Sequence, residues 1–192
     1  MEKQPFETQA FKDVMVEAIV SLPQDMKAVL RIVEDPDLED AQRTLAAGSL
    51  VHVLSASNAI PGMRGTLAYV DDAIVLRLVL ERLVRDAPEA MAHHQEDSPE
   101  LFEPLAAQME TIRGYLGDLL VVLERAVDTL PELTHEGHTP AGCARDPDDS
   151  TWLYDAVHGA LVDELEFDAD AVERALRQVD QIRRPLEMRL AR

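Results

Sequence analysis

Two histidines and the single cysteine of the chain lie close together between residues 135 and 143. They follow the order His-x-x-His-x4-Cys, as His135, His138 and Cys143. Imidazole nitrogens and a cysteine thiolate are ligands that zinc prefers, and Glu136 or Asp146 could supply a fourth ligand. The spacing raises the hypothesis of a zinc site, although the stretch has no CxxC pair and no helical HExxH motif. The alternatives are a solvated, flexible loop and a Cys143 nucleophile with one of the histidines as its base.

The adjacent carboxylates of Asp71 and Asp72 form a second candidate site. Neighbouring side chains on a helix point about 100° apart, so a cation site there needs Asn58 or a further carboxylate brought in by the fold. Acidic residues also suit the start of a helix, where they cap backbone N–H groups and complement the helix dipole for about 1 kcal/mol. We favour this capping interpretation, because two carboxylates without other ligands are weak support for a metal site.

The elements that must position these residues are helical. Apolar residues recur every three or four positions over most of the chain, and no segment shows the alternation of a strand. The pattern predicts a helix up to Leu22, a new helix that starts at Pro23, and a helix that is apolar on most sides between residues 71 and 87. We therefore predict an all-α fold, an irregular bundle of about 6–7 helices with a long central helix.

The longest expected helix runs from residue 98 to residue 130. Glycines at 114 and 117 lie inside it, where they weaken a helix. Its sustained apolar face is typical of either a core helix or a helix that pairs with another chain. Proline and glycine then interrupt the pattern, so residues 131–149 are expected to form an irregular loop. The residues of this apolar seam that we consider for an interface are Leu105, Ile112, Leu116 and Leu123.

Charge and composition argue against several function classes. The chain has 37 Asp and Glu against 18 Lys and Arg, a net charge of −19, so its field repels phosphates and makes nucleic acid and anionic lipid surfaces poor partners. A single cysteine cannot form an internal disulfide, and the first residues lack the apolar run of a signal peptide, which points to the cytoplasm. The longest uncharged stretch, residues 44–63, holds too many polar and turn-forming residues for a transmembrane span.

The segment SASNAIPGMRGTLAYVDD, residues 55–72, resembles the signature of the YkvA-like family, a small helical bacterial family of unknown function. The family pattern reads Ser-Pro-Ile-Asp-Leu-Ile-Pro-Asp, followed by Gly-Tyr-Leu-Asp-Asp. The resemblance implies a helical domain over residues 1–95, with residues 96–192 packing on it or continuing it as one domain. It implies no reaction and leaves peripheral membrane association open. The residues that carry it are Asn58 (where the family has Asp), Ile60, Pro61, Tyr69, Asp71 and Asp72.

Two functions follow from these features. The first is a cytoplasmic, non-catalytic protein that uses no cofactor and binds a protein partner or a second copy of itself through the apolar seam. The second is a metal- or small-ligand-binding protein, or an enzyme, that uses either residues 135–143 with zinc or the region around Asp71 and Asp72. We favour the first function, because the resemblance supplies no catalytic residue.

Overall fold

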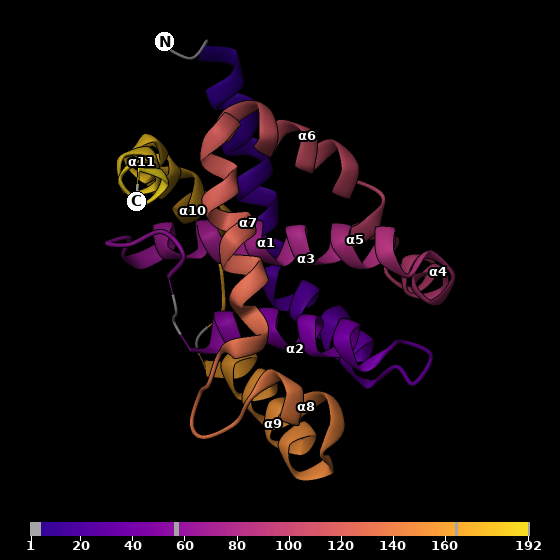
Figure 1. Ribbon diagram of the computed structural model, residues 1–192. Coiled ribbons are helices and arrows are strands. Elements are labelled where there is room, and N and C mark those ends of the chain that lie inside the picture. Colours follow the sequence, from indigo (N-terminus) through magenta and orange to yellow (C-terminus); the bar gives the residue numbers. More distant parts are fainter. Residues whose placement is uncertain (1–4, 56–57, 164, 192) are drawn as a thin grey trace.

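The computed structural model describes residues 5–55, 58–163 and 165–191 (Figure 1). Within these ranges the fold is all-α, as predicted, and contains no strand. None of the helices in these ranges is both long and apolar enough to cross a membrane. The helices are α1 (Pro5–Glu34), α2 (Asp40–Leu54), α3 (Tyr69–Asp86), α4 (Pro88–Asp97), α5 (Pro99–Phe102), α6 (Leu105–Leu116), α7 (Leu120–Thr129), α8 (Pro140–Arg145), α9 (Pro147–Asp163), α10 (Ala169–Leu176) and α11 (Arg183–Leu190).

Helix α3 lies at the centre of the bundle. Every side chain from Val70 to Leu80 is buried, and α1, α2, α6 and α7 all pack against this helix. Figure 1 shows α3 crossing α7 at a steep angle. A helix that is apolar on most sides requires such a position, because an exposed face would leave apolar area in water. The buried guanidinium of Arg77 is compensated by Asp25 of α1 at 3.3 Å and by Gln108 of α6 at 2.8 Å.

Helix α1 runs without interruption through Pro23, where the sequence predicted the start of a new helix. That prediction is wrong. Proline has no N–H to donate and crowds the preceding turn, which costs about 3 kcal/mol in a helix interior. Large apolar side chains on both sides of it, including Phe11, Ile19 and Met26, are fully buried. Their burial outweighs the local cost, since each such side chain stabilises the fold by about 1.5–3 kcal/mol.

The long helix predicted for residues 98–130 is divided into α5, α6 and α7. Gly117 ends α6 with φ 56° and ψ −132°, a backbone conformation that glycine adopts far more easily than any other residue. The chain then makes a 3-10 turn over Gly117–Leu119 and continues as α7 in a different direction (Figure 1). Gly117, which the sequence indicated as a residue that weakens the helix, therefore ends it.

The apolar seam lies in the core of the molecule and not on its surface. Its members join one apolar cluster that draws side chains from both halves of the chain, with α2 packed on α8 and α1 on α10. The proposed use of the seam as an interface is wrong for this fold, because an interface residue must be accessible to its partner. The four side chains are at most 6% exposed: Leu105, Ile112, Leu116 and Leu123.

Residues 131–149 are more regular than the sequence predicted. The Thr139 hydroxyl accepts a hydrogen bond from the N–H of Gly142 at 3.1 Å, and Pro140 occupies the first turn of α8. This cap and this proline start a helix inside the expected loop. Helix α8 packs against α2 and α9, which anchors the segment to the bundle.

Candidate metal centre

The structure does not bring His135, His138 and Cys143 together as a metal site. The Nδ1 of His138 lies 2.7 Å from Asp149, and its ring stacks on Trp152 with 4.2 Å between the centroids. Cys143 is fully buried, and this burial raises the pKa of its thiol to about 11. The ligand atoms of the three residues do not converge within the described part of the chain, so the structure does not support the zinc hypothesis. A thiol with a raised pKa is also a poor nucleophile at neutral pH, which argues against the nucleophile hypothesis.

Among the described residues, there are two other places where a group of three metal-ligating side chains converges. The more deeply buried group combines the predicted pair Asp71 and Asp72 with His52. Helix α2 carries the histidine near its C-terminal end, α3 carries the two aspartates in its first turn, and the two helices pack on each other. The Nε2 of His52 lies 3.7 Å from Asp71 Oδ2 and 3.4 Å from Asp72 Oδ1. All three residues are less than 7% exposed.

Asp71 does not cap α3 as predicted. The helix begins at Tyr69, two residues earlier, and its N-cap residue Ala68 makes no side-chain hydrogen bond. The Oδ2 of Asp71 instead accepts the backbone N–H groups of Ala59 and Ile60, the latter at 3.3 Å. Asp71 therefore fixes the loop between α2 and α3, while both carboxylates still gain from the positive end of the helix dipole.

Helix α11 also binds the loop between α2 and α3, at the residue that Asp71 contacts. The Nη1 of Arg189 donates a hydrogen bond to the carbonyl oxygen of Ala59 at 2.7 Å. The Ala59 residue is therefore bound by Asp71 through its N–H and by Arg189 through its carbonyl. These two contacts determine where the loop passes over the carboxylates.

Two ligand atoms of the cluster are buried without a hydrogen-bond partner among the described residues. They are the Nε2 of His52 and the Oδ1 of Asp71. Burial, and then the negative charge of Asp71, raise the pKa of Asp72 well above its usual value. In the described part of the chain, no lysine or arginine lies within 4.0 Å of either carboxylate. The cluster thus concentrates negative charge without a nearby fixed positive charge.

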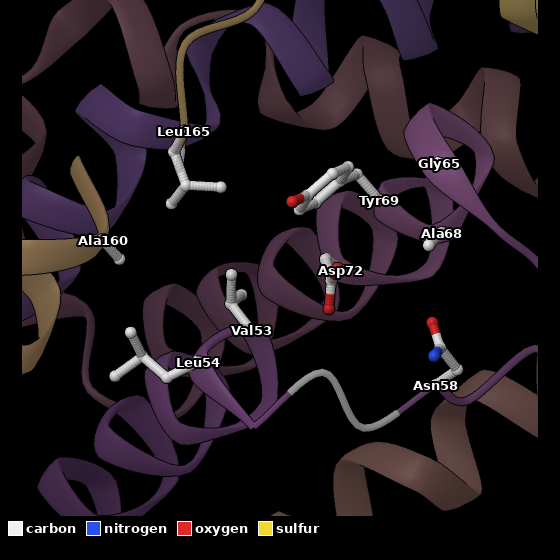
Figure 2. A pocket seen from close by; sticks show the side chains of 9 residues that line it. All are labelled: Val53, Leu54, Asn58, Gly65, Ala68, Tyr69, Asp72, Ala160 and Leu165. Carbon is white, nitrogen blue, oxygen red and sulfur yellow. The ribbon is translucent and has the colours of Figure 1, made fainter. Parts of the chain in front are cut away.

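Asp72 also reaches a pocket of about 250 Å³ (Figure 2). Figure 2 shows the carboxylate of Asp72, the hydroxyl of Tyr69 and the amide of Asn58 on one side, and apolar side chains on the other. The ring of Tyr69 packs edge-on against Phe167, with 4.9 Å between the centroids, which fixes its position. The apolar lining opposite Asp72 includes Val53, Leu54, Ala160 and Leu165.

The residues of the predicted signature separate into three roles. Asn58, Tyr69 and Asp72 line the pocket, and Asp71 binds the loop. The side chain of Ile60 is fully buried in the core, whereas Pro61 is exposed. Ala56 and Ser57 of this segment lie outside the described residues.

The sequence analysis missed His52, the residue that turns the pair of carboxylates into a three-ligand cluster. The only signal was a histidine within an otherwise uncharged helical stretch, residues 44–54. Such a histidine usually marks a satisfied core position, and nothing local indicates that α3 will pack opposite it. One imidazole nitrogen with carboxylate oxygens is a donor set that suits a first-row divalent cation.

Comparison of the chain with protein-family models, with curated proteins and with solved structures finds no match to any of the three. The resemblance to the YkvA-like family therefore stays a prediction from the segment at residues 55–72.

Proposed function

We propose that the protein binds a divalent metal cation between His52, Asp71 and Asp72. The observation that carries this proposal is the pair of buried ligand atoms without partners, His52 Nε2 and Asp71 Oδ1. Buried polar atoms are nearly always paired in folded proteins, because an unpaired one costs about 1–3 kcal/mol. A single cation among the three side chains would satisfy both atoms at once.

The charge of the cluster supports the same proposal. Two ionised carboxylates in a buried site cost several kcal/mol unless a positive charge lies beside them. In the metal-free protein, burial and the charge of Asp71 raise the pKa of Asp72, which favours the protonated form of this carboxyl. A divalent cation would take the place of that proton, so binding would release protons and become tighter as the pH rises.

The donor set indicates the kind of cation. Calcium prefers six to eight oxygen ligands and magnesium keeps most of its waters, whereas an imidazole nitrogen suits iron or zinc, and the two carboxylates also suit manganese. Three protein ligands leave coordination positions open, and the pocket beside Asp72 is where water or a small ligand would reach them.

Titration of chelator-treated protein with Mn²⁺, followed by the electron paramagnetic resonance of the free ion, tests the proposal. We expect the His52→Gln variant to bind Mn²⁺ about tenfold more weakly or worse, because glutamine cannot supply the imidazole nitrogen. His158→Gln is the matched control, since this histidine lies on α9 and pairs with the carbonyl of Tyr154. Equal Mn²⁺ binding by wild type and His52→Gln would refute the proposal, as would a wild type that binds none.

The interaction function that we favoured from the sequence loses its proposed surface, because the seam is buried. Binding of a protein partner stays a prediction without a defined interface, and so does the cytoplasmic location. Light scattering at micromolar concentration tests self-association directly. A dimer would require another surface of the molecule, and the four seam residues would play no part in it.

A further inference from the structure

A second group of metal-ligating side chains lies at the junction of α1 and α4. Asp35 follows the last residue of α1, while His93 and His94 are neighbours on α4. The Oδ2 atom of Asp35 lies 2.8 Å from the Nε2 of His94 and 3.4 Å from the Nε2 of His93. Both imidazoles therefore point at one carboxylate oxygen.

The fold builds this convergence from three local features. The Oδ1 atom of Asp35 accepts the backbone N–H of Asp37 at 2.9 Å, which orients the carboxylate and leaves Oδ2 facing α4. Only Ala87 separates the end of α3 from Pro88, which starts α4, so the position of α4 depends on the buried α3. The rings of His93 and His94 lie with their centroids 4.0 Å apart and 37° between their planes. Neighbouring residues of a helix leave its axis about 100° apart, and the side chains of His93 and His94 bring their rings together despite this angle.

The burial of the group is asymmetric. Asp35 and His94 are each 7% exposed, whereas the side chain of His93 is 51% exposed. The carboxylate of Asp35 is thus buried and oriented by the hydrogen bond from Asp37, while the group is open to solvent on the side of His93. A cation that binds there can keep water in its remaining coordination positions.

We propose that Asp35, His93 and His94 form a second metal site, selective for a late first-row transition metal such as Zn²⁺, Ni²⁺ or Cu²⁺. Two imidazole nitrogens and one carboxylate oxygen make a donor set that these ions prefer over Mg²⁺ and Ca²⁺. The hydrogen bond from Asp37 to the ligating carboxylate is the kind of outer contact that orients metal ligands in proteins. In the metal-free protein the imidazoles contact the carboxylate directly, and the cation replaces that contact with bonds to all three atoms.

This site is independent of the cluster at His52. It uses different helices and shares no residue with that cluster, and its two nitrogen donors favour a different class of ion. Its structural effect also differs, because a bound ion would link the C-terminal end of α1 to α4.

Titration of chelator-treated protein with Co²⁺, followed by the visible absorption of the bound ion, tests the second site. We expect the His93→Ala variant to lose one of two binding events and to bind Zn²⁺ about tenfold more weakly or worse in a calorimetric titration. Its fold is retained, because His93 is half exposed and the contact between His94 and Asp35 persists. His158→Ala on α9 is the matched control and leaves both events unchanged.

The His52→Gln variant separates this site from the proposed function. We expect it to remove the other Co²⁺ event and to leave the one assigned to His93. An unchanged titration in His93→Ala overturns the inference, as does loss of all Co²⁺ binding in His52→Gln. If His93→Ala unfolds, Asp35→Asn serves as the second variant, since its amide keeps the shape but is a weaker metal ligand; undiminished Co²⁺ binding by it also overturns the inference.

Discussion

Replacing Asp72 with asparagine should change how the stability of the metal-free protein depends on pH. Asp72 is 6% exposed and lies beside the charge of Asp71, and these two causes raise its pKa in the folded state. In the unfolded chain the same group has the ordinary pKa of an aspartate, about 3.9. Asparagine has nearly the same shape and no titrating proton, so it isolates this contribution.

Proton linkage determines the direction and the size of the change in unfolding free energy that Asp72 causes. Below about pH 4 both states carry the proton, and the group contributes no pH dependence. As the pH rises, the unfolded state loses its proton first, so the folded state binds more protons and the free energy of unfolding falls. The slope is at most about 1.4 kcal/mol per pH unit, until the pH passes the raised pKa of the folded state. Because Asp71 and Asp72 interact, this proton belongs to the pair.

Urea unfolding of wild type and Asp72→Asn in the presence of a chelator, from about pH 4.5 to pH 7, measures the difference directly. Titration of the buried Asp25 contributes to both proteins and cancels in the comparison. We expect the free energy of unfolding of the wild type to fall relative to the variant as the pH rises. Asp155→Asn, an exposed substitution on α9, should run parallel to the wild type.

Parallel curves for wild type and Asp72→Asn would refute the reasoning, because they would mean that the folded state gains no proton at this site. Saturating Mn²⁺ provides a further check. A cation that replaces the proton should abolish the decline of wild-type stability relative to the variant, whose own curve lacks this contribution and should change little.

Four further substitutions test the core and the backbone by chemical denaturation. Arg77→Met should destabilise the fold by about 3–5 kcal/mol, because it leaves the carboxylate of Asp25 buried without its cationic partner; a loss below about 1 kcal/mol would show that the hydrogen bond from the Ser21 hydroxyl is sufficient for Asp25. Gly117→Ala should destabilise the fold by about 1–3 kcal/mol, because alanine rarely adopts the positive φ of this residue. Gly114→Ala, inside α6 with open space around it, should stabilise the fold by about 0.5–1 kcal/mol. Equal effects of the two substitutions would contradict the assignment of the helix break to the backbone conformation of Gly117. Leu123→Ala should cost about 2–5 kcal/mol, as expected of a core residue, and a neutral result would return the seam to the surface.

The features that the sequence predicted correctly are those that depend on local pattern. Helical periodicity gave the all-α class, and the apolar circumference of residues 71–87 gave the central position of α3. The carboxylates of Asp71 and Asp72 stood out for the same reason, as neighbours in one short segment.

The features that the sequence missed depend on packing between distant elements. His52 meets the two carboxylates only because α2 and α3 pack against each other, and His93 and His94 meet Asp35 only because α4 packs beside the end of α1. The continuity of α1 through Pro23 likewise reflects tertiary burial that exceeds a local penalty. In the segment 135–143 the spacing of histidines and cysteine suggested a zinc site, but His138 contacts Trp152 and Asp149 instead.

The double anchoring of Ala59 sets an order of events during folding. Its N–H is bound by a residue 12 positions away, but its carbonyl is bound by Arg189, 130 positions away. Contacts between such distant positions require the closure of a long loop, and they form after local helices have paired. The loop over the carboxylates is therefore completed only when α11 docks. A cation bound at His52, Asp71 and Asp72 would act late, by slowing the unfolding of an assembled bundle and not by nucleating it.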